Sequence, residues 1–287
     1  MTDIRIQDFG ENSNPDANND FVMTFNDNSE SKTRLKDAFY AIVPDGAQTH
    51  NNIFRGWNLG TLDSTHIANI QNGSFHDMFI GDYFSINGSS YVIAGINYKR
   101  RHGDNMDLGN HLVLMPSDWS KTPTQTLNSS SKDPYMQDTD TTAGGFANTK
   151  LYKTYLPQIQ TKLESDFGNH LINFRTVVST HVDDSGAPDQ AEWRDAKVAI
   201  PNEVMIFGSL LNGNNKNGSW YNVGDEESQL PLMRLNDSER CNNRAGAFWL
   251  RDIHSASGFA DASGNGLAYW YVASGLWGGV RAFFLIG

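Results

Sequence analysis

The segment FADASGNGLAYWYVASGLWGGVRAFFLIG, residues 259–287, ends the chain and combines two patterns. Its last part, GGVRAFFLIG, is almost entirely apolar, which is typical of a strand buried in a core. The part before it gathers Tyr269, Trp270, Tyr271 and Trp277 among Gly, Ser, Ala and Asn. The segment therefore predicts both core strands and a face that touches a ligand.

The aromatic residues of this segment suit a binding face for a physical reason. Tyr and Trp give large, stiff contact areas, and small polar neighbours supply adaptable hydrogen bonds, as in evolved binding surfaces. In a strand, Tyr269 and Tyr271 share one side and Trp270 lies on the other, so at least one aromatic side is expected to stay exposed. The alternative, in which the whole group belongs to the core, remains open at this point.

The composition describes a globular, acidic chain. Its 287 residues are 38% hydrophobic and 11% aromatic, enough to bury a sizeable core. Charged residues make up only 19%, and abundant Asn, Ser, Thr and Gly favour turns and loops over long helices. The net charge is −11, and the one basic cluster, Lys99-Arg100-Arg101, is expected to be a solvated loop. Nucleic acid and anionic membranes are therefore poor candidates for partners.

Residues 1–46 differ from the rest and predict a small β-rich module. Two short strands are expected at Ile4–Phe9 and Phe21–Phe25, followed by a strand-to-helix segment at Lys32–Ala41. So small a module buries little apolar surface alone, so we expect it to attach or oligomerise the protein. The beginning of the chain lacks the basic and apolar regions of a signal peptide, and no apolar run is long enough to insert in a membrane. We therefore expect synthesis in a cytoplasm without secretion.

Residues 47–287 contain short strands and a few helices separated by polar loops. Alternating apolar runs indicate strands, and apolar residues spaced four apart indicate a helix face. The expected strands are a hairpin of Phe79–Ile86 and Tyr91–Ile96 around residues 87–90, and single strands in His111–Pro116, Val204–Leu211 and FWLRD at 248–252. One expected helix is capped by Asp63 or Ser64 and closed by Gly73. A second helix kinks or begins at Pro157, and one of its faces carries Leu151, Tyr155, Ile159 and Leu163.

The sequence offers little support for catalysis. Cys241 is the only cysteine, and the eight histidines form no H-E-x-x-H pattern. G-x-S-x-G, phosphate-loop and dinucleotide-binding patterns are absent as well, and no carboxylate spacing stands out. Oxygen-rich stretches at 16–21, 26–31 and 261–266 do not follow the order of a calcium loop. We therefore expect no catalytic residue, metal or cofactor, and calcium binding stays an open question.

Several segments carry a resemblance to a known family. They include IFRGWNLG at 53–60, EVMIFGS at 203–209, FWLRDIHSASGFA at 248–260 and GGVRAFFLIG at 278–287. In consistent order, they resemble phage tail and adhesion proteins with a C-type-lectin-like domain of the formylglycine-generating-enzyme type. Relatives end in GVRP, whereas this chain has Ala282 after Arg281. Formylglycine-generating enzymes use a pair of copper-binding cysteines, which this chain lacks, so that activity is not implied.

The resemblance implies an α+β fold, in which a β-rich N-terminal module, residues 1–46, precedes a C-type-lectin-like domain, residues 47–287. It implies a phage-tail receptor-binding protein of the virion, a homo-trimer that contacts other tail proteins through the N-terminal module and a host-surface glycan or protein through the C-terminal segment. The resemblance also implies that Arg251, Asp252 and Arg281 are charged residues buried in the scaffold, where each needs a partner. The ligand-binding positions implied by the resemblance are Asp261, Ser263, Asn265, Tyr269, Trp270, Tyr271, Ser274, Leu276 and Trp277.

Three alternatives share this sequence evidence. The first is a variable protein of a diversity-generating retroelement, which binds a protein or glycan with the same face. The second is a tail enzyme that depolymerises glycans through a carboxylate pair. The third is a structural tail component, in which contacts between subunits bury the aromatic residues.

Overall fold

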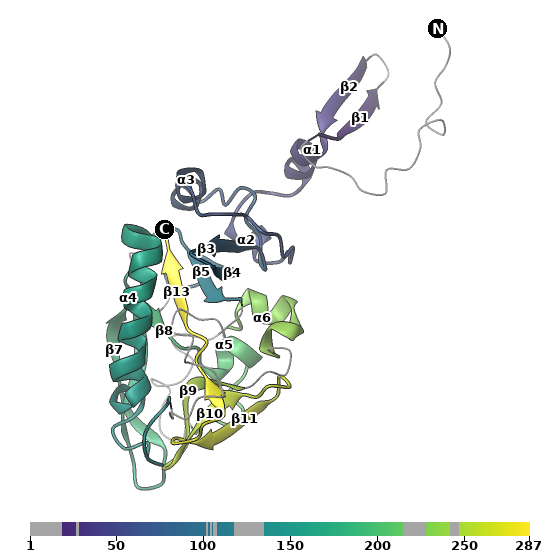
Figure 1. Ribbon diagram of the computed structural model, residues 1–287. Coiled ribbons are helices and arrows are strands. Elements are labelled where there is room, and N and C mark those ends of the chain that lie inside the picture. Colours follow the sequence, from purple (N-terminus) through teal and green to yellow (C-terminus); the bar gives the residue numbers. More distant parts are fainter. Residues whose placement is uncertain are drawn as a thin grey trace. The chain divides into compact units, whose positions relative to one another are not determined.

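The computed structural model describes residues 19–26, 29–101, 103, 105, 108–117, 135–214, 228–241 and 247–287 (Figure 1). The chain divides into two compact units, residues 1–45 and 46–287. This division lies one residue from the boundary expected from the sequence. The predicted strand Ile4–Phe9 lies outside the described residues.

The first unit contains a hairpin and a short helix. Strand β1 (Phe21–Asn26) pairs antiparallel with β2 (Ser29–Arg34), and α1 (Leu35–Ile42) follows directly. The strand near residue 21 and the strand-to-helix segment are thereby confirmed. Phe21 and Phe39 are both exposed, so this unit leaves large apolar side chains in contact with water.

The core of the second unit is a five-stranded antiparallel sheet with the order β3-β4-β5-β13-β8. The apolar end of the chain lies inside this sheet, between β5 and β8, and its side chains are buried. Core strands at the end of the chain are therefore confirmed. The strands are β3 (Tyr83–Ile86), β4 (Ser89–Ile96), β5 (Leu112–Pro116), β8 (Val198–Ala199) and β13 (Phe283–Ile286).

The hairpin of β3 and β4 has a tighter turn than expected. Only Asn87 and Gly88 form it, with φ values of 49° and 78°, and Ser89 already pairs with Ile86. Positive φ at both central residues is the geometry of the two-residue turn that matches the twist of paired strands. The hairpin is confirmed, with a turn shorter by two residues.

Helices cover this sheet. Helix α3 (Ser64–Asn72) begins at the Asp63 cap, whose carboxylate accepts the His66 N–H at 2.9 Å, and ends at Gly73 with φ of 75°. A π-helical turn (Leu151–Tyr155) leads into α4 (Leu156–Phe167), in which Pro157 is the second residue. Figure 1 shows α4 alongside β13, and the rings of Phe167 and Phe284 lie 4.9 Å apart. Both predicted helices are confirmed, and the proline lies at the beginning of α4.

A second sheet has the order β11-β10-β9-β12. Its strands are β9 (Ala247–Ser255), β10 (Gly258–Ala262), β11 (Ala268–Val272) and β12 (Gly278–Gly279). Strand β11, which carries the aromatic triplet, forms one edge. Strand β12 runs parallel to β9 and leads the chain from the aromatic segment into β13. The end of the chain therefore joins both sheets.

Two parts of the fold differ from the expectation. Val204–Leu211 was expected to be a strand, but α5 (Glu203–Phe207) lies there, because Asn202 caps the Met205 N–H at 2.8 Å and Gly208 ends the helix with φ of 78°. A short apolar run alone does not distinguish strand from helix. The hairpin of β6 (Phe174–Val182) and β7 (Pro188–Ala196) was not predicted, because β7 begins with a proline and four of its nine residues are charged.

The basic cluster also needs correction. Lys99 is buried, its backbone N–H donates to His111 Nε2 at 3.1 Å, and its ammonium lies 5.9 Å from the ring centres of Phe174 and Phe283. This lysine therefore belongs to the core and not to a solvated loop. The remaining described helices are α2 (Ala47–His50), α6 (Pro231–Leu235) and the 3-10 turns η3 (Phe146–Asn148), η5 (Gly168–His170) and η6 (Asp237–Arg240). None of the helices in the described ranges has the length and apolarity needed to cross a membrane.

The packing of α4 on β13 gives a first test. Phe284 is buried and its ring lies within 5.4 Å of Tyr91 and 4.9 Å of Phe167. Phe284→Ala is expected to lower the free energy of unfolding by about 3–5 kcal/mol, through lost burial and the cavity left behind. Urea denaturation followed by tryptophan fluorescence measures this. Leu211→Ala, at an exposed apolar position, is the control, and equal effects for both variants would contradict the packing.

Candidate ligand-binding surface

Strand β11 divides its aromatic residues between two sides. The rings of Tyr269 and Tyr271 contact each other with centres 5.7 Å apart. Trp270 lies on the other side and stacks on His254, with centres 4.1 Å apart and planes inclined by 14°. The alternation expected for this strand is confirmed, and a structural partner for Trp270 is identified.

Large apolar side chains stay exposed on and beside β11. The exposed fraction is 63% for Leu267, 52% for Tyr269 and 63% for Trp277, while Tyr271 is half-buried. Leu276 is also exposed. We call Leu267, Tyr269, Tyr271, Leu276 and Trp277 the aromatic surface.

Hydrogen bonds hold the turns that flank β11. Ser274 donates from its backbone N–H and its hydroxyl to Asp140 Oδ1, at 3.1 and 2.5 Å. In the turn before the strand, the Ser263 hydroxyl donates to the Leu267 carbonyl at 3.0 Å, and Gly266 has a φ of 82°. A Cβ at Gly278 would lie 2.4 Å from the Trp249 indole, so only glycine fits there. The aromatic surface is therefore presented by a fixed backbone.

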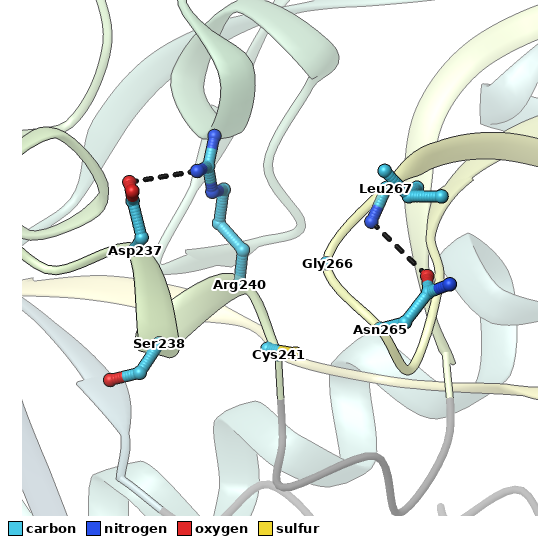
Figure 2. A pocket seen from close by; sticks show the side chains of 7 residues that line it. All are labelled: Asp237, Ser238, Arg240, Cys241, Asn265, Gly266 and Leu267. Carbon is cyan, nitrogen blue, oxygen red and sulfur yellow. Dashed lines mark hydrogen bonds and ion pairs between the residues drawn. The ribbon is translucent and has the colours of Figure 1, made fainter.

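A pocket of about 650 Å³ lies beside the turn between β10 and β11 (Figure 2). One wall comes from η6, where Arg240 pairs with Asp237 at 2.7 Å. Leu267 belongs both to the pocket and to the aromatic surface, so the two features adjoin. The lining residues are Asp237, Ser238, Arg240, Cys241, Asn265, Gly266 and Leu267.

Three buried carboxyl groups lie in or next to this sheet, on α5 (Glu203), β9 (Asp252) and β10 (Asp261). Glu203 accepts backbone N–H groups of Leu211, Asn212 and Gly213 at 2.9, 2.9 and 2.7 Å. Its own backbone N–H donates to Asp252 Oδ2 at 2.6 Å. No atom of the described residues forms a hydrogen bond with the Asp261 carboxyl, which is 1% exposed. Burial, and then the neighbouring charge of Glu203, raises the pKa of Asp252 and that of Asp261 to about 7.

His254 connects this acidic region to the aromatic strand. Its Nδ1 lies 2.7 Å from the Asn212 carbonyl, in the turn whose N–H groups bind Glu203. Its ring supports Trp270 from below. Glu203, the turn at 211–213, His254 and Trp270 thus form a continuous series of contacts under β11. His254 therefore has a structural hydrogen bond, as expected for most histidines outside a site.

The structure brings some of the nine predicted ligand-binding residues together at the surface. Asn265, Tyr269, Leu276 and Trp277 are exposed, and Ser263, Trp270, Tyr271 and Ser274 are half-buried. Asp261 lies in the interior, with a side chain that is 1% exposed, on strand β10, which has a neighbouring strand on each side. Leu267 and the η6 wall were missed, although Leu267 continues the alternation of Tyr269 and Tyr271.

The predicted scaffold charges are buried and have partners. Arg251 donates to Thr176 Oγ1 at 3.0 Å, and Asp252 accepts the Glu203 N–H. Arg281 pairs with Glu239 at 2.6 Å. This prediction is confirmed for Arg251, Asp252 and Arg281.

The site offers little for metal or acid–base chemistry. No group of three His, Cys, Asp or Glu side chains within the described ranges could hold a metal ion. Asp252 and Asp261 have the raised pKa of a general acid, yet both are buried and neither lines the pocket beside β11. Exposed aromatic and apolar groups on a rigid frame suit binding. Comparisons with protein-family models, curated proteins and solved structures found no match.

The buried acids predict a pH-dependent stability. An acid whose pKa rises on folding, here from 3.8 to about 7, stabilises the fold below pH 4 and loses that contribution as the pH rises through 7. Wild-type protein is therefore expected to lose stability between pH 4.5 and pH 8. Asp261→Asn should remove about 1–3 kcal/mol of that loss, which urea denaturation at both pH values measures. Asp138→Asn, at an exposed site, is the control, and an unchanged pH dependence in Asp261→Asn would contradict the assignment.

Proposed function

We propose that this chain is a receptor-binding protein of a phage tail, which recognises a host-surface ligand through the aromatic surface. The observation that carries the proposal is the exposure of Leu267, Tyr269 and Trp277 on a backbone fixed by turns and buried charges. Exposed apolar area costs about 25 cal/mol per Å² relative to burial. A group of such side chains on a rigid frame is the usual mark of an interaction site.

The proposed fold class of the second unit is C-type-lectin-like. The support comes from the segments that carry the resemblance, residues 203–209, 248–260 and 278–287, which lie mainly in the buried frame around the aromatic surface. The described fold itself is a mixture of helices and largely antiparallel sheets. In this proposal the frame is kept and the exposed positions determine the ligand.

The first unit would attach the protein to other tail proteins and join copies into a trimer. Its exposed Phe21 and Phe39 suit a contact with other chains. Three copies of one shallow site raise apparent affinity by avidity, without any new contact.

The trimer gives a direct test. Light scattering of the full chain is expected to give a mass of about three times 31.9 kDa, independent of concentration in the micromolar range. Phe21→Ser combined with Phe39→Ser should shift the mass toward the monomer. A stable wild-type monomer would contradict the trimer while leaving the binding surface untouched.

The variable protein of a retroelement is the second candidate, and one observation favours it. Four of the nine positions that the resemblance implies to vary are exposed side chains of one short segment, residues 265–277. Adenine-rich codons at those positions and a nearby template repeat would distinguish this candidate from a fixed receptor-binding protein.

Binding to cells tests the proposed function. Labelled Tyr269→Ala/Trp277→Ala protein is expected to bind a panel of bacterial cells at least about tenfold more weakly than wild type, because the two side chains supply much of the contact area. Flow cytometry measures the binding. Trp57→Ala is the control, since this side chain is 58% exposed and lies outside the aromatic surface. Equal binding by wild type and the Tyr269/Trp277 variant would reject the aromatic surface as the site.

A further inference from the structure

The backbone of strand β11 bonds to β10 on one side. Ser263 N–H donates to the Leu267 carbonyl at 2.9 Å, and Ala273 N–H donates to the Ser257 carbonyl at 2.7 Å. Bonded and non-bonded pairs alternate in an antiparallel ladder, so Tyr269 and Tyr271 exchange backbone hydrogen bonds with β10. The backbone N–H groups of Ala268, Trp270 and Val272 therefore point outward.

No strand of the described chain pairs with this outer side, since β11 neighbours only β10. Outward N–H and C=O groups recur every second residue, about 7 Å apart. This repeat matches the distance between successive hydrogen-bonding groups of a neighbouring strand.

Several other edges of the second unit carry protection that no described residue gives to β11. At the edge of β6, the Asn105 side chain bonds the backbone N–H and carbonyl of Arg175 at 2.7 and 2.8 Å. Strand β7 carries a proline, four charged residues and irregular pairing with β6. The outer side of β3 is bonded by residues 57–60, and β8 and β12 have only two residues each. Strand β11, with the sequence AYWYV, has no charge, no proline and an unbroken register. Proteins normally block such edges because they pair with other chains.

We propose that β11 binds an extended polypeptide segment of the ligand as an added strand. This inference rests on the proposed function and names its ligand class as protein. The added strand satisfies the outward groups of Ala268 and Trp270 and the N–H of Val272, whose carbonyl already accepts the Gly275 N–H at 2.8 Å. Its alternate side chains lie against Tyr269 and Tyr271. The net charge of −11 favours a segment that carries Lys or Arg.

A sugar ligand or a second copy of the chain fits these observations less well. A sugar ring stacks on aromatic groups but does not require a row of peptide groups at strand spacing. In the proposed trimer the copies meet through the first unit, so association of copies does not require β11.

The probe for this inference is a displayed library of random dodecapeptides, selected on the wild-type full chain. The affinity of a selected peptide is measured by fluorescence anisotropy, and each peptide amide is then methylated in turn. Methylation at alternate residues is expected to weaken binding by more than about tenfold, and methylation at the residues between them by less than about twofold. Uniform tolerance along the peptide would overturn strand addition.

Substitutions in the protein give the complementary test. Ala268→Pro and Val272→Pro each remove an outward N–H while keeping the ladder to β10, as proline is tolerated on the open side of an edge strand. Each is expected to weaken peptide binding at least about tenfold, whereas the controls Ala268→Ser and Val272→Ala should not. Thermal unfolding checks that the variants fold, and the methylation scan decides the matter if they do not.

The outcomes separate this inference from the proposed function. Suppose that Tyr269→Ala/Trp277→Ala loses binding to cells while both folded proline variants bind the cells and the selected peptide as wild type does. This result would overturn strand addition and keep the receptor-binding proposal. If no peptide is selected and the protein binds purified cell-surface oligosaccharides, the aromatic surface would be assigned to glycans and strand addition would be overturned. A dimer that Val272→Pro dissociates would assign the edge to a second copy.

Discussion

The buried guanidinium of Arg281 is the contact on which the arrangement of the second unit depends. It lies between β12 and β13, where the chain passes from one sheet to the other. Its Nε donates to the Pro116 carbonyl at 3.3 Å, at the end of β5, and its Nη2 donates to the Glu239 carboxylate at 2.6 Å, in η6. A buried charge without partners costs several kcal/mol, so these segments must meet at this point. One side chain thereby fixes the core sheet, the pocket wall and the strand that returns from the aromatic surface.

The frame around Arg281 explains how the aromatic surface keeps its shape while its side chains stay exposed. Among the described strands, β11 pairs with β10 alone, and its ends are fixed by Ser274 on Asp140 and by the Ser263 turn. Beneath it, Trp270 rests on His254. The exposed residues therefore contribute little to the stability of the fold, and the buried ones contribute little to contact with a ligand. Such a division allows the exposed residues to change without loss of the frame.

The sequence predicted those parts of the fold that local patterns determine. Alternation identified the hairpin of β3 and β4 and the two sides of β11, and caps at Asp63 and Gly73 identified α3. The hairpin of β6 and β7 was not predicted, because polar residues on both strands leave no clear alternation of apolar and polar positions. Helix α5 was taken for a strand because a short apolar run is ambiguous until the Asn202 cap is considered. The depth of Lys99 and Asp261 depends on contacts from distant segments, which no local pattern contains.

The outer edge of β11, which no strand of the described residues covers, can in principle pair with a copy of the chain or with another protein. The same row of free N–H and C=O groups that suits a foreign strand also suits self-association. In the proposed trimer the copies meet through the first unit, so their association does not use this edge. The net charge of −11 attracts segments that carry Lys or Arg. Selection among partners then arises from the charge of the whole chain, while affinity arises from the backbone of β11 and the exposed side chains beside it.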